Sequence, residues 1–389
     1  MMSEYDVIII GAGSIGVPTA HKIAETGQKV LCLDRYPSPG QGDNKHAIGG
    51  IRATHSQKAK IWVSLRSLEI LRSWEEKFGD DIEWYEGGYL FVAYSEKDAE
   101  TFKKTVSHQQ QQGLAINWID AQEVSELVPG INKNGLLGGT YSPKDGNTNS
   151  LLTNHAFYAQ ALHHGAEFKF KEEVIDIHTE NDQITGVRTI KDVYKAPIVI
   201  NAAGGYATAV AKMVGLDVPV TPDSHEAGIT EPIDRFFSPM IVDIRPQKNE
   251  RFGNSKNYYF YQNKQGQLIF CITPDPPIYG YSTQETSSFL PQVSQRMINL
   301  MPRLQNLKVR RTWRGLYPNT PDGSPIVGTV KYIEGYINAV GMGGQGLMLG
   351  PGLSEVLARL VNGKTSERDD LILKEFSLHR DFRSDEIFK

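Results

Sequence analysis

The stretch VIIIGAGSIGVPTAHKIAETGQKVLCLD, residues 7–34, decides the fold of this chain. Its apolar, β-branched start predicts a strand over 5–10 that is buried on both faces of a parallel sheet. Apolar residues at helical spacing then predict a helix over 14–26, and a second strand is predicted over 29–33. The stretch is therefore a βαβ unit with a glycine-rich turn after its first strand.

Three glycines in this turn fit the phosphate-binding fingerprint of a dinucleotide fold. Gly11 permits the tight turn, Gly13 lets the backbone approach a pyrophosphate, and Gly16 lets the helix pack closely on the strand. The phosphates then lie at the positive end of the helix. Asp34 ends the second strand, where its carboxylate accepts hydrogen bonds from a ribose diol and repels a 2′-phosphate. The motif predicts an adenine dinucleotide without that phosphate and leaves NAD and FAD open.

Later segments of the chain favour FAD. PIVINAAGG, residues 197–205, predicts a strand that returns to the nucleotide-binding sheet, and residues 172–177 predict another, which places Val174 beside adenine. GYINAVGMGGQGLMLGP, residues 335–351, predicts a strand, a second glycine-rich loop and the start of a helix. Two such loops suit a long cofactor whose second half needs its own helix end.

The composition excludes several classes of function. The 389 residues include 41 Lys and Arg against 45 Asp and Glu, a net charge of −4, so no basic field is present to hold nucleic acid. The apolar run at 7–10 is too short to span a membrane and lacks the flanks of a signal peptide, which predicts a cytoplasmic protein. Cys32 and Cys271 lie in separate apolar runs and are predicted to be buried thiols. Without a CxxC or HExxH pattern, no metal is expected.

The chain carries six motifs that occur together in one known family: IIIGAGSIG at 8–16, GGIRATH at 49–55, GGYLFVA at 87–93, VINAAGG at 199–205, RTWRGLYPNTPDGSPIVG at 311–328 and GMGGQGLMLGP at 341–351. In these motifs, and over nearly its whole length, it resembles the D-amino-acid-oxidase-like FAD-dependent oxidoreductases. Within that family it is similar to the branch of sarcosine oxidase, dimethylglycine dehydrogenase and the L-proline dehydrogenase β-subunit. The resemblance implies an α/β (α+β) fold, in which a Rossmann-like FAD-binding βαβ domain is joined to a substrate domain with a mainly antiparallel sheet.

The predicted elements divide the chain into five alternating segments. Residues 1–86, 151–215 and 311–389 are expected to form the FAD-binding domain, and residues 87–150 and 216–310 the substrate domain. The strands predicted for the substrate domain are HEAGITE at 225–231, NYYFYQ at 257–262 and QLIFCIT at 267–273.

The resemblance implies that FAD lies extended between the two glycine-rich loops. Its adenine end lies at the first loop, and its ring system faces the second, where backbone amides at a helix start stabilise negative charge on the reduced flavin. The predicted cofactor-binding residues are Gly11, Gly13, Ser14, Ile15, Gly16, Asp34, Arg35, His46, Ile51, Arg52, Val174, Ala203, Gly204, Gly315, Gly343, Gly344, Gln345, Gly346, Leu347 and Met348.

Arg52 is the best candidate for substrate binding. It lies in a glycine-flanked turn before a helix predicted over 58–78, and its guanidinium fork suits bidentate capture of a carboxylate. In sarcosine oxidase an arginine at the matching place has this role. A phosphate contact or a surface ion pair is the alternative.

His225 and Tyr259 complete the predicted catalytic set, because they lie on the strands expected to cover the flavin. Strand alternation places Tyr259 and Tyr261 on one face and Tyr258 on the other, so only part of this set can face the cofactor. Core packing is the alternative for such aromatic residues.

The chain departs from the family pattern at several positions. Sarcosine oxidase uses a lysine for the carboxylate where this chain has Met348, which favours a bulkier or cyclic amino acid. No lysine occurs in 268–273, where monomeric sarcosine oxidases carry one over the flavin, so a dehydrogenase or a slow oxidase is expected. Gly315 stands where those enzymes have their flavin-linked cysteine, and His46 resembles the linking histidine of dimethylglycine dehydrogenases. Non-covalent FAD is expected, with a link through His46 as the alternative.

These features predict FAD-dependent oxidation of the C–N bond of a small secondary or N-methylated amino acid. The α-hydrogen leaves as a hydride equivalent to flavin N5, and water hydrolyses the resulting imine. Oxygen, a quinone or a partner protein would accept the electrons, and a hetero-oligomer is compatible with the last of these. Two rival functions stay open: an NAD-dependent dehydrogenase, which rests on the first motif alone, and an FAD-containing assembly factor or partner subunit without turnover.

Overall fold

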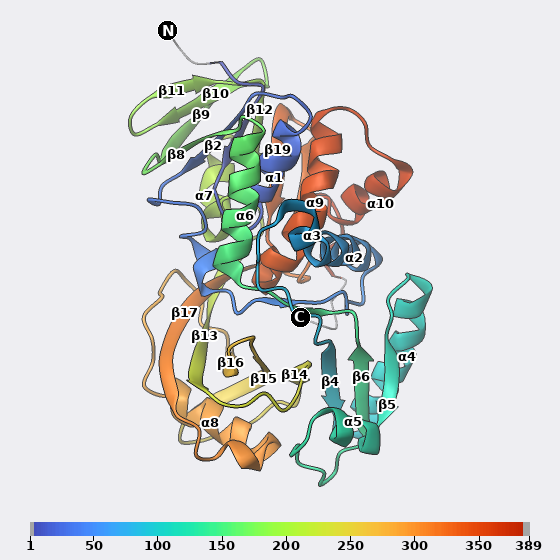
Figure 1. Ribbon diagram of the computed structural model, residues 1–389. Helices are drawn as coiled ribbons and strands as arrows, with labels where there is room; N and C mark the ends of the chain where they lie inside the picture. Colours follow the sequence, from blue (N-terminus) through green and yellow to red (C-terminus); the bar gives the residue numbers. More distant parts are fainter. Residues whose placement is uncertain (1–3, 384–389) are drawn as a thin grey trace.

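The computed structural model describes residues 4–383 and contains two large sheets, one above the other in Figure 1. The upper sheet is built around β1 (Val7–Ile10), which is buried because both of its faces are covered. β1 pairs in parallel with β2 (Val30–Asp34) and β12 (Ile198–Asn201), and β12 pairs in parallel with β19 (Ile333–Val340). The quoted N-terminal stretch therefore forms the parallel βαβ unit that the sequence predicts.

Five further strands complete the upper sheet: β8 (Glu167–Phe170), β9 (Val174–Glu180), β10 (Gln183–Thr189), β11 (Val193–Lys195) and β18 (Ile326–Val330). The main order is β11-β10-β19-β12-β1-β2-β8, with β18 beside β19 and β9 beside β10. The strands predicted near 172–177, 197–205 and 335–351 are thus present as β9, β12 and β19.

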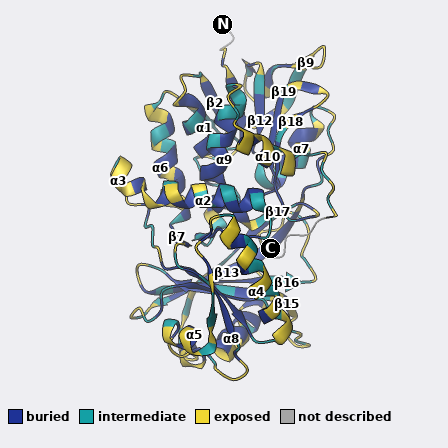
Figure 2. Ribbon diagram, turned by 90° about the vertical axis from the view of Figure 1, so that its right-hand side faces the viewer, coloured by how far each residue is buried: buried dark blue, intermediate teal, exposed yellow. Residues whose placement is uncertain are grey.

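Side chains of β1 alternate between two cores. Val7 and Ile9 face one core, and Ile8 and Ile10 face the other, which includes residues of β9 and β10. Figure 2 shows the central strands as buried and the outer faces of several helices as exposed. The helices of the upper half are α1 (Gly16–Ala24), α2 (Lys58–Arg72), α3 (Trp74–Phe78), α6 (Ser150–His163), α7 (Ala207–Lys212), α9 (Gly346–Val361) and α10 (Glu367–Glu375).

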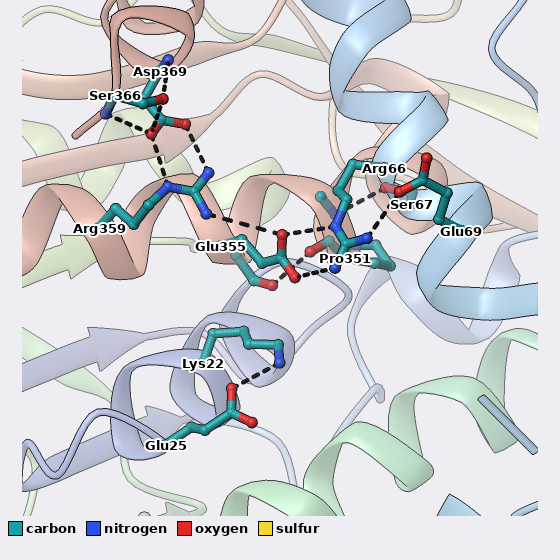
Figure 3. Close-up of polar contacts among 12 residues, drawn as sticks. Lys22, Glu25, Arg66, Ser67, Glu69, Pro351, Glu355, Arg359, Ser366 and Asp369 are labelled. Carbon is teal, nitrogen blue, oxygen red and sulfur yellow. Dashed lines mark hydrogen bonds and ion pairs between the residues drawn. The ribbon is translucent and has the colours of Figure 1, made fainter. Parts of the chain in front are cut away.

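Ion pairs link α9 to α2 and to α10 (Figure 3). Arg66 on α2 lies 2.8 Å from the Glu355 carboxylate on α9, and Arg359 on α9 lies 2.7 Å from the Asp369 carboxylate on α10. Gly352 permits the close approach of α9 to α2, since a Cβ there would lie 2.3 Å from the Val63 carbonyl oxygen. These contacts fix the helix that begins at the second glycine-rich loop.

The lower sheet is mainly antiparallel, with β4 and β14 as its parallel pair. Its strands are β4 (Tyr89–Ala93), β5 (Asn117–Asp120), β6 (Gly138–Ser142), β13 (Thr221–Pro232), β14 (Met240–Asp243), β15 (Asn254–Gln262), β16 (Gln267–Asp275) and β17 (Val309–Asn319), in the order β17-β13-β16-β15-β14-β4-β6-β5. The fold class predicted from the sequence is confirmed: a nucleotide-binding sheet joined to an antiparallel one. The remaining elements are β3 (Gly50–Ile51), β7 (Gly146–Asn147), α4 (Glu96–Gln111), α5 (Ala121–Leu127), α8 (Phe289–Leu300) and the 3₁₀ turns η1 (Asp43–His46), η2 (Gly204–Tyr206), η3 (Pro302–Leu304) and η4 (Gly343–Gln345).

The five-segment domain division stays a proposal. Its boundary between residues 310 and 311 lies inside β17, a strand of the lower sheet. The helix predicted over 58–78 is divided into α2 and α3 at Ser73, whose hydroxyl donates to the Glu69 and Ile70 carbonyls and so competes with helical hydrogen bonding.

Two predictions from composition can be compared with the structure. Cys32 and Cys271 are both free and buried, as expected. Within residues 4–383, no helix combines the length and apolar character needed to cross a membrane.

Candidate functional site

A cavity of about 760 Å³ is lined by residues of both large sheets and by both glycine-rich loops. This volume falls within the range of roughly 300–1,000 Å³ that is usual for ligand and cofactor sites. The upper sheet presents the ends of β1, β2, β12 and β19 to the cavity, and the lower sheet presents β13, β15, β16 and β17. The same cavity therefore reaches both the first glycine-rich motif of the sequence and the last.

The first glycine-rich loop forms one part of the wall. Gly11 has a φ of +109°, and a Cβ there would lie 2.4 Å from the Ala202 carbonyl oxygen, so the turn requires glycine. At Gly13 a Cβ would meet nothing within 4 Å, which leaves the backbone open toward the cavity. A Cβ at Gly16 would lie 1.8 Å from the Gly11 carbonyl oxygen. The three glycines thus show the turn, the close approach and the helix packing that the fingerprint needs.

Asp34 lies at the cavity wall beside this loop. Its carboxylate accepts hydrogen bonds from the Ala12 amide at 2.6 Å and the Tyr36 amide at 2.8 Å. Burial raises the pKa of Asp34, and the two amide donors oppose that rise. Each carboxylate oxygen keeps acceptor capacity for a ribose hydroxyl.

The second glycine-rich loop forms η4 and the start of α9. Gly343 has a φ of +54°, and a Cβ at Gly346 would lie 2.8 Å from the Ser14 hydroxyl. A Cβ at Gly350 would lie 1.9 Å from the Ser14 carbonyl oxygen, so the two loops are packed directly together. The first amides of α9 have no partner within the helix and give this end a positive dipole, which suits negative charge on a bound ring system.

Most of the predicted cofactor-binding residues line the cavity, and two do not. Gly16 is used for packing α1 on β1, and Ile51 of β3 is fully buried in the core, so neither reaches the cavity surface. Direct contact of Ile51 with the cofactor is therefore not supported by its position. The predicted residues that do line the cavity are Gly11, Gly13, Ser14, Ile15, Asp34, Arg35, His46, Arg52, Val174, Ala203, Gly204, Gly315, Gly343, Gly344, Gln345, Gly346, Leu347 and Met348.

Several residues of the cavity wall carry a buried polar atom that has no hydrogen-bond partner from the protein. These atoms include Gln345 Oε1, His225 Nδ1, His46 Nδ1 and Asn44 Oδ1. Buried polar atoms are normally paired, so these atoms fit a polar ligand that completes their bonding. Together with the open backbone at Gly13, they fit a long cofactor with phosphate, ribityl and ring groups.

Asp43 is a wall residue that the sequence analysis did not select. Its carboxylate accepts a hydrogen bond from the Gly205 amide at 3.3 Å, and burial raises its pKa to about 6. It faces the cavity from η1, next to η2. No sequence pattern pointed to it, because its position depends on the meeting of two 3₁₀ turns from distant segments.

An aromatic wall is formed by four strands of the lower sheet. The Tyr259 and Tyr317 hydroxyls lie 2.6 Å apart, and the His225 ring stacks on the Tyr317 ring at 3.9 Å with an angle of 16°. His225 Nε2 lies 3.2 Å from the Asp223 carboxylate. The Cys271 thiol contacts both tyrosine hydroxyls, and burial raises the pKa of all three groups. Neutral hydroxyls therefore face the cavity.

The alternation predicted for β15 is confirmed. Tyr259 lines the cavity, whereas Tyr258 lies in the core on the opposite face, packed with Phe260 and residues of α8. Tyr261 shares the face of Tyr259, but its hydroxyl donates to the Ile48 carbonyl and does not line the cavity. Core packing is thus the role of Tyr258 and Tyr261.

Arg52 lies at the cavity wall and is only 6% exposed. Its Nη1 donates to the Thr54 carbonyl and lies 3.3 Å from His55 Nδ1. The Asp145 carboxyl lies close by and accepts hydrogen bonds from Ala53 N and the Thr54 hydroxyl, each at 3.2 Å. Burial raises the pKa of Asp145 to about 7, although the Arg52 charge opposes this rise. The guanidinium is therefore held rigidly in a desolvated setting.

The two positions considered for covalent flavin attachment lie side by side. A Cβ at Gly315 would come 2.5 Å from His46 Cβ, so there is no room for a larger residue at Gly315 while His46 keeps its place. Burial lowers the pKa of His46 to about 4, which keeps its imidazole neutral. Non-covalent binding stays a prediction.

The strand expected to lack a cation over the flavin is β16, which presents Cys271 and Thr273 to the cavity. Its neighbour β15, however, presents Lys256 to the same cavity. The register between β15 and β16 shifts between Ser255 and Tyr258, and such an irregularity changes the direction of side chains. A lysine is thus present at the wall, on a different strand from the one considered in the sequence.

The comparison with protein families decides the identity of this fold. The sequence model of the FAD-dependent oxidoreductase family, abbreviated DAO, matches residues 6–360. The chain belongs to the FAD-dependent oxidoreductase family. Its cofactor is FAD, which answers the choice between NAD and FAD that the first motif left open.

This FAD-dependent oxidoreductase is similar to several characterised proteins. It is 25% identical to sarcosine oxidase subunit beta of Rhodobacter capsulatus, over 97% of this chain and 88% of that protein. It is also 25% identical to mitochondrial dimethylglycine dehydrogenase of Mus musculus, over 87% of this chain and 40% of that protein. The chain thus spans less than half the length of the mitochondrial enzyme.

A solved structure supports the same assignment. The crystal structure of L-proline dehydrogenase from P. horikoshii has a TM-score of 0.89, with 29% identity, and the match covers 98% of both chains. The predicted family and its sarcosine oxidase, dimethylglycine dehydrogenase and proline dehydrogenase branch are confirmed as the relatives of this chain.

Proposed function

We propose that this FAD-dependent oxidoreductase oxidises the C–N bond of a small secondary or N-methylated amino acid. The observation that carries the proposal is the buried guanidinium of Arg52 at the wall of the FAD cavity. The similar proteins named above act, by their names, on sarcosine, dimethylglycine and L-proline, all of which carry a carboxylate beside a secondary or tertiary amine. Bound FAD supplies the acceptor for the hydride equivalent that leaves the substrate.

Arg52 orients the substrate through its carboxylate. A guanidinium donates two parallel hydrogen bonds to a carboxylate, and such bonds are stronger where water is excluded. Arg52 is already positioned by the Thr54 carbonyl, so little side-chain freedom is lost when substrate binds. This anchoring sets the direction in which the Cα–H bond points.

The aromatic wall acts on the amine. Tyr259 and Tyr317 offer neutral hydroxyl groups, since burial raises the pKa of both. A neutral, desolvated wall disfavours the ammonium form and so favours the free amine that can be oxidised. No acid or base residue is required for this step, and water hydrolyses the imine that forms.

Met348 favours an apolar group on the part of the substrate that it contacts. It is buried at the cavity wall, at the position where sarcosine oxidase has a lysine. Its flexible thioether accepts apolar groups of varied shape and does not attract a carboxylate. We therefore favour a substrate bulkier than sarcosine, or a cyclic one.

The test is anaerobic mixing of the purified protein with sarcosine, dimethylglycine, L-proline, glycine and D-amino acids while flavin absorbance is followed. The best acid is then compared with its carboxylate-free amine in wild type and in Arg52→Ala. Loss of a bidentate contact should cost about 2 to 4 kcal/mol, a factor of roughly 30 to 1,000 in kcat/KM for the acid and far less for the amine. Arg52→Lys should recover only part of the loss, because a point charge cannot replace the fork.

Arg296→Ala is the matched control. Arg296 is a buried arginine bonded to the Ser255 hydroxyl and to the Asp243 and Arg245 carbonyls, and it does not line the cavity. Equal losses for acid and amine in Arg52→Ala, or the same acid-specific loss in Arg296→Ala, would count against a carboxylate-binding role.

The same panel separates the enzyme from a non-catalytic partner subunit. One similar protein, from Rhodobacter capsulatus, is named as a subunit, and this name is the observation that favours a role as a partner subunit. Bleaching of the flavin by any amino acid establishes turnover. If no amino acid on the panel bleached it, the assignment as an FAD-containing partner subunit would be favoured, and co-purification with a second chain would then be examined.

A further inference from the structure

His21 is a buried histidine with no polar partner. It lies in the last turn of α1, is completely buried, and neither Nδ1 nor Nε2 forms a hydrogen bond within the protein. Aromatic rings surround it, including those of Trp74, Phe78 and Phe157. Buried polar atoms are normally hydrogen-bonded, so two orphaned nitrogens on one ring need an explanation.

Two other side chains that can bind a metal ion, those of Glu25 and His164, lie beside His21. Glu25 follows it by four residues, so both lie on the same face at the end of α1. His164, the residue after α6, stacks on the His21 ring at 5.5 Å. One ligand atom from each of the three side chains lies within 4.8 Å of the other two, so a small movement brings all three to a common centre.

We propose that His21, Glu25 and His164 bind a divalent transition-metal ion of the zinc class. Two imidazoles and one carboxylate are a ligand set that zinc uses in proteins, with a fourth position left for water. Imidazole nitrogens favour zinc, cobalt, nickel or copper over magnesium and calcium, which prefer oxygen ligands. Glu25 is exposed and His164 is not fully buried, so an ion would approach the buried His21 from their side of the cluster.

The local electrostatics contribute in both directions. The C-terminal ends of α1 and α6 both lie at the cluster, and a helix C-terminus favours a cation. Against this, the Lys22 ammonium lies 2.7 Å from the Glu25 carboxylate, as Figure 3 shows, and Lys77 adds positive charge.

The competition between Lys22 and a metal ion for the Glu25 carboxylate can be tested. A metal ion must displace Lys22 from Glu25, so removal of the Lys22 charge should strengthen metal binding. None of the three ligating residues lines the FAD cavity. The ion therefore joins α1 to α6 and stabilises the fold, and flavin reduction should not depend on it.

The experiment uses the FAD-loaded full chain, free of any affinity tag and pretreated with a chelator. Zinc binding is measured by equilibrium dialysis, and the thermal midpoint is recorded with and without ZnCl₂. Wild type should bind one zinc ion per chain and unfold at a higher temperature with zinc. His164→Ala and Glu25→Gln should each weaken zinc binding by about tenfold or more and reduce the thermal shift. Both substitutions are at the surface, so His21 itself need not be changed.

His163→Ala is the matched control, because His163 is the neighbouring imidazole that touches His164 but is not part of the cluster. It should bind zinc as wild type does, and Lys22→Ala should bind zinc more tightly. Equal affinity of wild type and His164→Ala, or an equal loss in His163→Ala, would overturn the proposal. So would an unchanged or weaker affinity in Lys22→Ala.

Discussion

The hydroxyl groups of Tyr259 and Tyr317 lie 2.6 Å apart although β15 and β17 are not neighbours in the lower sheet. Between these strands lie β13 and β16, which contribute His225 and Cys271 to the same wall. The tyrosine side chains therefore meet over two intervening strands and cover them. A single hydrogen bond joins the edge of the sheet to its middle at the point where substrate is proposed to bind.

This pair should matter for flavin reduction. Removal of either hydroxyl, in Tyr259→Phe or Tyr317→Phe, should lower kcat/KM by about tenfold, equivalent to about 1.4 kcal/mol for one hydrogen bond. Tyr258→Phe is the control, since its hydroxyl is buried without a partner on the opposite face, and its loss should leave reduction unchanged and stability equal or higher. Stopped-flow reduction and urea unfolding provide both readouts, and an equal kinetic loss in all three variants would contradict the assignment.

Asp34 should control FAD retention. Asp34→Ala removes the proposed acceptor for the ribose hydroxyls, and a hydrogen bond to a charged group is worth about 1.5 to 3 kcal/mol, so the Kd for FAD should rise roughly 10- to 100-fold. Dialysis followed by the flavin-to-protein absorbance ratio measures the loss, and circular dichroism checks folding. Asp6→Ala is a suitable control, because Asp6 also accepts from a backbone amide, that of Lys29, but lies outside the cavity. Full flavin retention in Asp34→Ala would be incompatible with this role.

Asp145 should make stability fall as pH rises. Burial raises its folded-state pKa from 3.8 to about 7, so between these values the folded protein binds more protons than the unfolded chain. The free energy of unfolding then decreases from pH 4 toward pH 7, with a slope from this one group of at most about 1.4 kcal/mol per pH unit. Asp145→Asn should remove this contribution. Urea unfolding of both proteins between pH 5 and pH 8 should show that wild type loses stability relative to Asp145→Asn as the pH rises, and a constant difference would show that Asp145 does not titrate in this range.

Reduced enzyme should react faster with an artificial dye or a quinone than with air. A cation beside the flavin stabilises developing superoxide, and β16 supplies none, since its cavity residues are Cys271 and Thr273. Lys256 is the lysine that reaches the cavity from β15, so Lys256→Met should slow the reaction with oxygen further and leave the dye rate unchanged. Stopped-flow reoxidation measures both rates. Fast reoxidation by air that persists in Lys256→Met would mean that another group supplies the charge.

The fold could be predicted because its signals are local. A few adjacent residues contain both the apolar run of β1 and the glycines of the turn that follows it. At Gly11 and Gly16 a Cβ would collide with backbone atoms, so the sequence pattern is tied to this backbone arrangement. The break at Ser73 could not be predicted, because a serine can occur inside a continuous helix or at the point where a helix ends. The surrounding structure determines which of the two forms, and here the Ser73 hydroxyl bonds to the Glu69 carbonyl.

Motifs and strand patterns in the sequence point to some of the residues that line the cavity. Arg52 and Asp34 follow strands or turns with a recognisable pattern, and both line the cavity. Asp43, Asp145 and Lys256 have no such pattern. The position of Asp43 depends on the contact between two 3₁₀ turns, and Asp145 is buried beside the turn at Ala53, which is distant in sequence. The strand of Lys256 contains a register shift. None of these features can be recognised in a single sequence.

The direct packing of Gly346 and Gly350 on Ser14 has a consequence for biosynthesis. Because translation runs from the N-terminus, the nucleotide-binding turn leaves the ribosome long before the loop that packs against it. A nascent chain can form the early strands and helices, but it cannot enclose the cofactor until η4 and the first turns of α9 have been made. Enclosure of FAD therefore has to wait for the synthesis of this second loop, and a chain released before residue 346 lacks one wall of the site.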